Sequence, residues 1–255
     1  VHRLNLGNGN VRKMLSYANP VLLKRFLKEI KSGQPHVVHL FSGVGYPWSA
    51  LAAHYLYRRK IPLVITVHDP TPHPGDVWSM PTFALLRISL NYATRVHVHA
   101  ETFRRELIKL GVAPERIDVI PHGSLAPRFV RHRGYEQRRE LLALFFGRVQ
   151  PYKGLEYFLE AILLLNGQFR AAIAGPGRFS NRARALLEVK PELFEVYNRY
   201  LHEAEVAELF QRASVCVLPY VHATQSSVPL IAAAFGVPVV ATNLGAFVED
   251  IHRVR

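Results

Sequence analysis

The segment LLALFFGRVQPYKGLEYFLEAILLL, residues 141–165, joins an apolar run to an amphipathic stretch through a polar, glycine-bounded turn. The apolar run at 141–146 predicts a strand, and the stretch after Gly154 predicts a helix because its apolar residues recur with helical spacing. A strand that leads directly into a helix is half of a βαβ unit. The segment therefore predicts an α/β fold with a parallel sheet.

The same alternation runs along the whole chain in two series. In the first series the expected strands are 36–41, 62–68, 95–99 and 117–120, and the expected helices are 47–60, 79–91 and 101–110. In the second series the expected strands are 141–146, 169–174, 193–197, 214–219 and 237–241, and the expected helices are 153–165, 180–188, 203–212 and 226–235. Two Rossmann-like parallel-sheet units follow from this pattern.

The boundary between the two units is expected in the basic stretch Ser124 to Arg139, where the apolar periodicity lapses. Residues 1–133 hold 19 Lys and Arg against 7 Asp and Glu, a net charge of +12, whereas residues 134–255 hold 13 against 12, a net charge of +1. We therefore predict domains at 1–133 and 134–255, with the basic excess in the first.

Composition excludes a disordered or fibrous chain, since 49% of the 255 residues are apolar and 20% are charged. The net charge of +13 predicts an acidic partner: nucleic acid, anionic lipid or a phosphorylated substrate. A single cysteine, Cys216, rules out an internal disulfide bond and a cysteine-based metal cluster, and it suits a reducing compartment. We expect a cytoplasmic protein.

Two stretches, Ser32–Tyr57 and Ala213–Val248, contain no Asp, Glu, Lys or Arg. Histidines or prolines interrupt both, so neither offers the roughly 20 consecutive apolar residues of a membrane span. The chain starts without Met and ends soon after an expected strand. We therefore expect a fragment that is incomplete at both ends.

The turn from Gly147 to Gly154 carries two cations, Arg148 and Lys153. It lies at the carboxyl end of an expected parallel strand and opens a helix, where backbone N–H groups and the helix dipole favour an anion. We interpret it as an anion site suited to a diphosphate. For two isolated cations the alternative is a solvated basic turn.

The motifs around this turn resemble, in their order, the family 4 retaining glycosyltransferases of the GT-B fold. In the second half these are the turn AGPG with Gly175 and Gly177, then SVCVLP, AFGVPVVAT and the segment Gly245 to Glu249. In the first half they are TVHDP, VHVHAETFRREL and IPHGS, the last with His122 where the family has Asn. The resemblance covers most of the chain. It implies two Rossmann-like domains that face each other across a cleft, the acceptor domain first and the nucleotide-sugar domain second.

The resemblance also implies a reaction: transfer of a hexosyl group from a nucleoside diphosphate sugar to a hydroxyl acceptor, with retention. Arg148 and Lys153 would bind the donor diphosphate, with Gly175 and Gly177 in the same donor site. The physical argument agrees, because fixed cations stabilise a departing anionic diphosphate. The sequence has no D-x-D pair to bridge Mg²⁺. We expect metal-independent transfer, with no cofactor beyond the nucleotide sugar as co-substrate.

One departure from the family lies in the second half. The family usually has two glutamates eight positions apart, and these positions hold Ala223 and Ile231. The ribose and the sugar would then be held by Thr224, Gln225, Ser226, Ser227 or backbone groups. The alternative for these four is a helix N-cap and first turn, which is compatible with ligand binding. The alternative function is a non-catalytic nucleotide-sugar-binding homologue.

His68 and Asp69 end an expected strand of the first half, at the edge where open α/β sheets bind ligands. The family has a histidine near this point, so both are candidate catalytic residues, with Asp69 orienting the His68 ring. Glu249 resembles a donor-facing acidic residue of the family, and its alternative is a helix cap. The other strand histidines, His36, His39, His97 and His99, are interpreted as packing or surface residues.

The segment Pro20–Gly33 places Leu22, Leu23, Phe26, Leu27 and Ile30 on one helical face and Lys24, Arg25, Lys28 and Lys31 on the other. An ordinary surface helix is the simpler interpretation. In a half of net +12, the basic face also suits an anionic lipid surface, which predicts a peripheral position on the inner face of the membrane. The resemblance implies a glycan or lipid-linked acceptor, because many members of the family find lipid-linked acceptors at such a surface. Nucleic acid is not expected, because no nucleic-acid-binding motif accompanies the charge.

Overall fold

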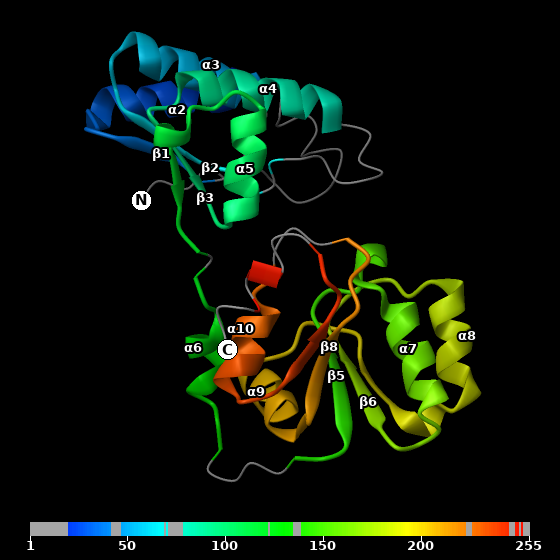
Figure 1. Cartoon of the computed structure of the whole chain (residues 1–255). Coiled ribbons are helices and arrows are strands. Elements are labelled where there is room, and N and C mark those ends of the chain that lie inside the picture. The colour runs from blue at the N-terminus through cyan, green and yellow to red at the C-terminus, as the bar shows by residue number, and fades with distance from the viewer. Residues whose placement is uncertain are drawn as a thin grey trace. The chain divides into compact units, whose positions relative to one another are not determined.

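The computed structural model describes residues 20–41, 47–68, 70, 79–121, 123–134, 139–222, 226–244, 248–249 and 251. The chain divides into two compact units, residues 1–121 (unit 1) and residues 122–255 (unit 2) (Figure 1). Each unit is built on its own parallel sheet. The two parallel-sheet α/β units expected from the sequence are confirmed.

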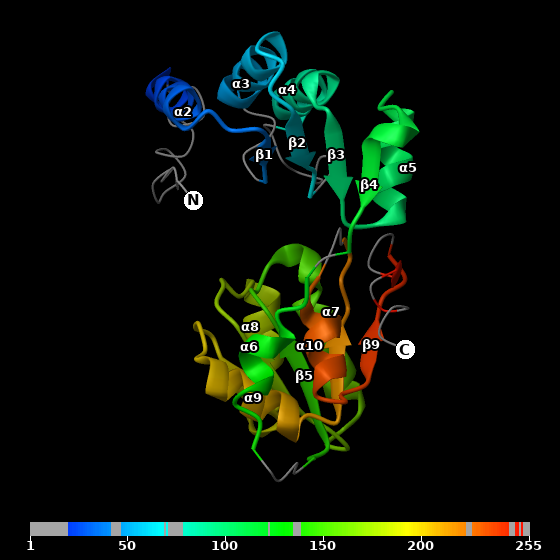
Figure 2. The ribbon, with the colours of Figure 1, turned by 90° about the vertical axis from the view of Figure 1, so that its left-hand side faces the viewer.

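Unit 1 contains, within the described residues, a four-stranded parallel sheet in the order β1-β2-β3-β4. The strands are β1 (Val38–Leu40), β2 (Leu63–Thr66), β3 (Arg95–Val98) and β4 (Ile117–Val119). The helices are α2 (Pro20–Gly33), α3 (Pro47–Arg58), α4 (Ser79–Tyr92) and α5 (Glu101–Lys109), with a 3₁₀ turn η1 (Pro114–Arg116). Figure 2 shows α2 to α5 following one another along one side of the sheet.

The two faces of the unit 1 sheet differ in polarity. Alternate strand residues are buried and apolar, namely Val38, Leu40, Leu63, Ile65, Val96, Val98 and Ile117. Between them stand His39, which is exposed, and Val64 and His97, which are half-buried. Successive side chains on a strand point to opposite faces, so runs such as HVVHLF and RVHVH give one apolar and one polar face.

Unit 2 contains, among the described residues, a five-stranded parallel sheet in the order β7-β6-β5-β8-β9. The strands are β5 (Leu142–Phe146), β6 (Arg170–Ala174), β7 (Phe194–Tyr197), β8 (Val215–Leu218) and β9 (Val239–Ala241). The helices are α6 (Ala126–Val130), α7 (Leu155–Leu164), α8 (Asn181–Val189), α9 (Glu203–Arg212) and α10 (Val228–Ala234), with 3₁₀ turns η2 (Pro151–Lys153) and η3 (Pro191–Leu193).

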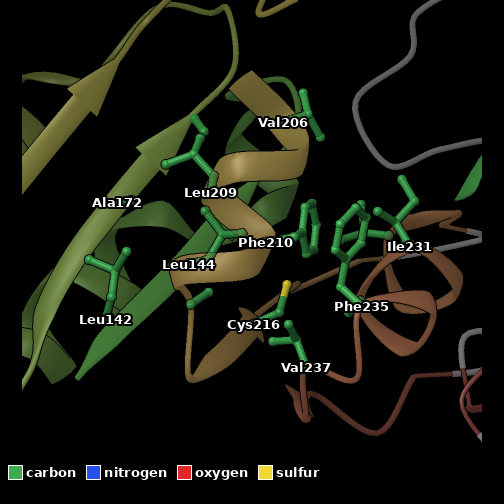
Figure 3. Close-up of a cluster of buried hydrophobic side chains, with 14 of the residues drawn as sticks. Leu142, Leu144, Ala172, Val206, Leu209, Phe210, Cys216, Ile231, Phe235 and Val237 are labelled. Carbon is green, nitrogen blue, oxygen red and sulfur yellow. The ribbon is translucent and has the colours of Figure 1, made fainter. Parts of the chain in front are cut away.

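Both faces of the unit 2 sheet are covered. On one face Leu142 and Leu144 of β5 belong to a cluster with α9 and α10, in which the rings of Phe210 and Phe235 stack with centroids 5.7 Å apart (Figure 3). On the other face Ala143 and Phe145 pack with helix α7. Burial on both faces explains why the β5 run is apolar at every position.

Cys216 of β8 lies in the cluster with α9 and α10. Burial raises the pKa of its thiol to about 12. The thiol therefore stays protonated at neutral pH and behaves as a small apolar side chain.

Helix α6 lies inside the stretch that the sequence marked as the boundary. Its Phe129 and Val130 pack against the cluster formed with α9 and α10. Arg128 and Arg131 donate hydrogen bonds to the carboxylate of Glu203 at the start of α9, and these bonds lower the pKa of that carboxyl to about 2. Because α6 packs on unit 2, the structural division falls after Pro121, earlier than the predicted boundary between residues 133 and 134.

The two uncharged stretches are accounted for by short elements. The first includes β1 and α3, and the second includes β8, α10 and β9. In the part of the chain that the structure describes, every helix is too short or too polar to cross a bilayer.

Candidate active site

The loops after β5 and β6 lie against each other at the carboxyl edge of the unit 2 sheet. Val149 and Gly177 form a parallel bridge, and the N–H of Val149 donates to the carbonyl of Pro176 at 2.9 Å. The loop after β5 then passes through η2 into α7. The turn that carries Arg148 and Lys153 is thus fixed by a second loop of the same edge.

Gly175 and Gly177 make this close approach possible. Gly175 has φ +142°, and a Cβ atom on it would lie 2.2 Å from the carbonyl oxygen of Gly147. A Cβ atom on Gly177 would lie 2.3 Å from the carbonyl oxygen of Val149. Backbone atoms cannot yield as a flexible side chain does. The two predicted donor-site glycines therefore lie at the expected edge, where they allow the loops to meet.

Lys153 is a half-buried cation above an aromatic ring. Its Nζ lies 5.0 Å from the centroid of the Tyr220 ring and 2.6 Å from the place of a Cβ atom on Gly147. Burial, and next the positive charge of Arg148, lower the pKa of Lys153 to about 8. Within the described residues neither Lys153 nor Arg148 has an acidic partner.

This arrangement favours an anionic ligand. A buried cation normally has a counter-charge, and two neighbouring cations repel each other until an anion lies between them. Hydrogen bonds between charged partners are stronger than neutral ones. Arg148 is exposed and can reach a ligand at the same edge. The structure thus brings together the two residues that the sequence selected.

Tyr220 is a residue of this site that the sequence analysis missed. It follows β8, its side chain is buried, and burial raises the pKa of its hydroxyl well above the usual value. Its hydroxyl lies 3.4 Å from Oγ of Ser226. The signal in the sequence is an aromatic residue directly after SVCVLP, at the carboxyl end of an expected strand.

Ser226 and Ser227 stand at the start of α10. Oγ of Ser226 accepts a hydrogen bond from the N–H of Val228 at 3.3 Å, and Ser227 is the N-cap residue. Through Tyr220, Ser226 is linked to the environment of Lys153. Thr224 and Gln225 lie outside the described residues, as does Ala223. Glu249 is described and half-buried, and its donor-side role stays a prediction.

In unit 1, His68 follows β2 at the carboxyl edge of the sheet. Its Nε2–H donates to the carbonyl of Phe41 at 3.0 Å, and its ring lies 5.1 Å from the Phe41 ring and 5.0 Å from the His99 ring. Asp69 lies outside the described residues. A catalytic role for His68 stays a prediction.

Of the other four histidines, three form hydrogen bonds within the sheet, whereas His36 precedes β1 and is exposed. Nε2 of His39 lies 2.8 Å from Oγ1 of Thr66, which lies 3.1 Å from Nδ1 of His97. His97 and His99 both donate to the carbonyl of Ile120, each at 3.0 Å. Burial, and next the nearby His97, lower the pKa of His39. Their hydrogen bonds account for these three histidines within the fold.

Comparison with known proteins finds family models that match both units. A family model described as Glycosyl transferase 4-like domain matches residues 1–123, and one described as Glycosyl transferases group 1 matches residues 140–254. The first half of the chain thus belongs to the Glycosyl transferase 4-like domains, and the second half belongs to the Glycosyl transferases group 1. An uncharacterised glycosyltransferase of Methanocaldococcus jannaschii is 28% identical over 156 residues, which make up 59% of this chain and 39% of that protein.

Solved structures show that the chain has the GT-B fold. HepE of Anabaena, in complex with UDP and glucose, matches with a TM-score of 0.69 and 16% identity over 92% of this chain and 66% of its own. Sucrose-phosphate synthase of Thermosynechococcus elongatus matches with a TM-score of 0.70 and 18% identity over 95% of this chain and 65% of its own. The chain spans about two thirds of these structures and well under half of the M. jannaschii relative.

Ile231 is one of the two positions at which the resemblance implies a glutamate in the family. Its side chain is 1% exposed and belongs to the core cluster with Phe235. An isolated carboxylate is too costly to bury in such a cluster. This side chain therefore packs α10 against the sheet.

Proposed function

We propose that the chain carries the donor and acceptor parts of an enzyme that moves a hexosyl group from a nucleoside diphosphate sugar to a hydroxyl acceptor. The observation that carries the proposal is the pair Arg148 and Lys153, which lacks an acidic partner within the described residues and sits at the carboxyl edge of unit 2. We propose further that transfer proceeds with retention and without a metal ion.

The chemistry follows from charge. Negative charge grows on the diphosphate as its bond to the sugar breaks, and cations held in place beforehand stabilise that charge more than they stabilise the ground state. The ring of Tyr220 beneath Lys153 limits the freedom of the ammonium group without neutralising it. HepE was crystallised with UDP and with glucose, so UDP is the first nucleotide to test.

Calorimetry with UDP and GDP tests the donor site. Relative to the unmodified chain, the variant Arg148→Ala/Lys153→Ala should bind the nucleotide at least tenfold more weakly, since each charged hydrogen bond contributes about 1.5–3 kcal/mol. Arg105→Ala/Lys109→Ala removes the same charge from α5 of unit 1 and should leave affinity unchanged. If all three proteins bound the nucleotide with equal affinity, the assignment of Arg148 and Lys153 to the donor site would be wrong.

Metal independence has its own test. The proposal rests on the absence of a D-x-D pair from the sequence. Release of nucleoside diphosphate by the protein should therefore be the same with and without EDTA. Loss of turnover in EDTA and its return with Mg²⁺ or Mn²⁺ would contradict this part of the proposal.

A non-catalytic nucleotide-sugar-binding protein is the second candidate. It is favoured by the absence of any Asp or Glu from residue 209 to residue 248 and by the packing role of Ile231. The two candidates differ in turnover. The enzyme releases nucleoside diphosphate from a nucleotide sugar, whereas the binding protein shows saturable binding of the nucleotide sugar without release. Affinity without release over many hours would select the second candidate.

For the acceptor side we propose a glycan or lipid-linked acceptor at an anionic membrane surface, for a protein located in the cytoplasm. Helix α2 supports this, because Lys24, Arg25, Lys28 and Lys31 are exposed while Ile30 is buried. Leu22, Leu23, Phe26 and Leu27 are half-buried. The helix thus presents cations with apolar side chains beside them, the combination that binds anionic bilayers.

A further inference from the structure

The side-chain amine of Lys153 is held at a defined place in unit 2. Its Nζ lies over the Tyr220 ring, 5.0 Å from the ring centroid. Nζ also lies 2.6 Å from the place where a Cβ atom on Gly147 would stand. The amine therefore uses space that any side chain at position 147 would fill.

The backbone on both sides of Lys153 is fixed against the loop after β8. The carbonyl of Tyr152 accepts a hydrogen bond from the N–H of Val221 at 2.8 Å. A Cβ atom on Gly154 would lie 2.0 Å from the carbonyl oxygen of Pro219, so a larger residue has no room there. Lys153 is thus anchored at its backbone as well as at its amine.

The titratable groups that face Lys153 leave its amine nucleophilic. They are Arg148 in the same turn, Cys216 in β8 and Tyr220. Burial raises the pKa of the Cys216 thiol to about 12 and also raises the pKa of the Tyr220 hydroxyl, so both groups are neutral at neutral pH. Within the described residues Lys153 has no acidic partner. A lysine that is desolvated beside another cation is a typical protein nucleophile.

An anion site built around such a lysine can bring a reagent to the amine. Arg148 is exposed, and its planar guanidinium group suits a phosphate. A small molecule with a phosphate next to a reactive carbonyl would be held with that carbonyl close to Lys153, because the two cations belong to one turn. Acyl phosphates have this structure, since their phosphate is bonded through oxygen to the acyl carbon.

We propose that Lys153 is a site of covalent modification by acyl phosphates, with the phosphate bound at Arg148 and the acyl group transferred to Nζ. The neutral amine attacks the acyl carbon, a C–N bond forms, and the bond from that carbon to the phosphate oxygen breaks. Phosphate leaves with the electron pair of that bond and takes up the proton that the amine loses. The product is an amide, so the positive charge of the side chain is lost.

The modification removes one of the two cations of the proposed donor site. Acylation of Lys153 should therefore weaken UDP binding about tenfold or more, since a charged hydrogen bond is lost. This consequence rests on the proposed function, whereas the acylation itself needs only the anion site. A bound nucleotide would cover the same amine and should protect it from the reagent.

Incubation of the full chain with acetyl phosphate, followed by peptide mass spectrometry, tests the proposal. At neutral pH Lys153 should be acetylated about tenfold faster than Lys60 or more, because an amine with the usual lysine pKa of about 10.4 is almost entirely protonated there. The rate at Lys153 should reach half of its maximum near pH 8, since the pKa of Lys153 is about 8 and only the neutral amine reacts.

Lys60 is the matched control within the same chain. It is exposed, and its neighbour Arg59 lies over the Tyr55 ring, 5.4 Å from the centroid. It therefore shares with Lys153 an adjacent arginine and a nearby tyrosine, but it lies on the surface of unit 1. Equal rates of acetylation at Lys153 and Lys60 would overturn the proposal.

A change of reagent tests the role of the bound phosphate. p-Nitrophenyl acetate transfers the same acetyl group without a phosphate, so the preference for Lys153 over Lys60 should be several-fold smaller with it. Inorganic phosphate and the variant Arg148→Ala should each slow the reaction of acetyl phosphate at Lys153 and leave Lys60 unaffected. The same preference with both reagents, or a rate at Lys153 that neither phosphate nor Arg148→Ala changes, would overturn the proposal.

Calorimetry with UDP separates this inference from the proposed function. If Lys153 is acetylated selectively but UDP neither binds nor protects it, the proposed donor site is wrong and the modification site stands. If UDP binds but Lys153 reacts no faster than Lys60, the donor site stands and the modification site is wrong. Selective acetylation that UDP prevents, together with weaker UDP binding by the acetylated chain, would support both.

Discussion

The sheets of unit 1 and unit 2 have the same parallel architecture but differently used faces. In unit 2 both faces are packed, so β5 sends Leu142 and Leu144 into one cluster and Ala143 and Phe145 into another. In unit 1 one face is apolar, and the other carries a hydrogen-bonded row of His39, Thr66 and His97. This difference shows that a continuous apolar run marks a parallel strand packed on both faces, whereas an alternating run marks a parallel strand packed on one face.

The carboxyl edges of the two sheets differ as well. Unit 2 presents two cations in a turn held by close-packed glycine loops. Unit 1 presents the rings of Phe41 and His68, whose centroids are 5.1 Å apart. The edge of unit 2 thus carries positive charge, whereas the edge of unit 1 carries aromatic and imidazole rings.

The largest expected effect concerns the doubly packed sheet. Phe210→Ala should lower the free energy of unfolding by about 3–5 kcal/mol, because it leaves a cavity between α9 and α10. Leu164→Ala on α7 is the control, since that side chain is 86% exposed and its truncation should cost under about 0.5 kcal/mol. Urea unfolding measures both. Similar costs for the two variants would contradict the packing described for unit 2.

The charge difference between the units is tested next. Replacing Lys24, Arg25, Lys28 and Lys31 of α2 with Gln should reduce co-sedimentation with anionic vesicles, because each cation near such a surface contributes about 1 kcal/mol. UDP affinity should stay the same. Arg105→Gln/Lys109→Gln on α5 is the control and should still sediment. Equal partitioning onto neutral and anionic vesicles would refute membrane attraction, and tight DNA binding without partitioning would favour nucleic acid.

A smaller effect is expected from the glycine loops of unit 2. Gly175→Ala should destabilise the protein by about 2 kcal/mol or more and weaken UDP binding, because the new methyl group collides with the Gly147 carbonyl. Gly167→Ala is matched to it, with φ +90° and nothing within 4 Å of the added Cβ atom. The Gly167→Ala variant should lose stability through backbone strain alone, because its methyl group collides with no other atom. Equal stabilities for the two variants would show that the loops are not in close contact.

The smallest expected effect is a pH dependence of donor binding. The pKa of Lys153 is about 8, so the side chain is a cation below that pH and a neutral amine above it. Affinity for UDP should therefore fall as the pH rises through about 8, by at most tenfold per pH unit. Lys153→Arg stays charged and should bind UDP equally across this range. A pH-independent affinity of the unmodified chain would mean that Lys153 does not contact the nucleotide.

Most of the helices and strands were predictable because the spacing of apolar residues in each segment matches the period of a helix or of a strand. The segment 203–212 was predicted as a helix and is α9, with the same bounds. Helix α6 was missed because five residues with a proline give no helical period, and it forms through contacts of Phe129 and Val130 with distant parts of unit 2. Local pattern cannot reveal an element that tertiary packing alone stabilises.

The candidate site was predictable only in part. Arg148 and Lys153 stand out because glycines bound their turn, and the structure places them together. The ring of Tyr220 under Lys153 depends on the pairing of β5 with β8, which are more than 60 residues apart, so no local signal reveals it. The roles of Gly175 and Gly177 depend in the same way on which loops become neighbours.

The position of α6 bears on how unit 2 could be prepared alone for crystallisation or labelling. A recombinant piece that starts at residue 134 would lack Phe129 and Val130, and the surface on α9 and α10 that they cover would become exposed apolar area. It would also lose both arginines that bind Glu203. Exposed apolar area of this kind promotes aggregation. A piece that starts at residue 122 keeps the helix and should be the one that stays monomeric.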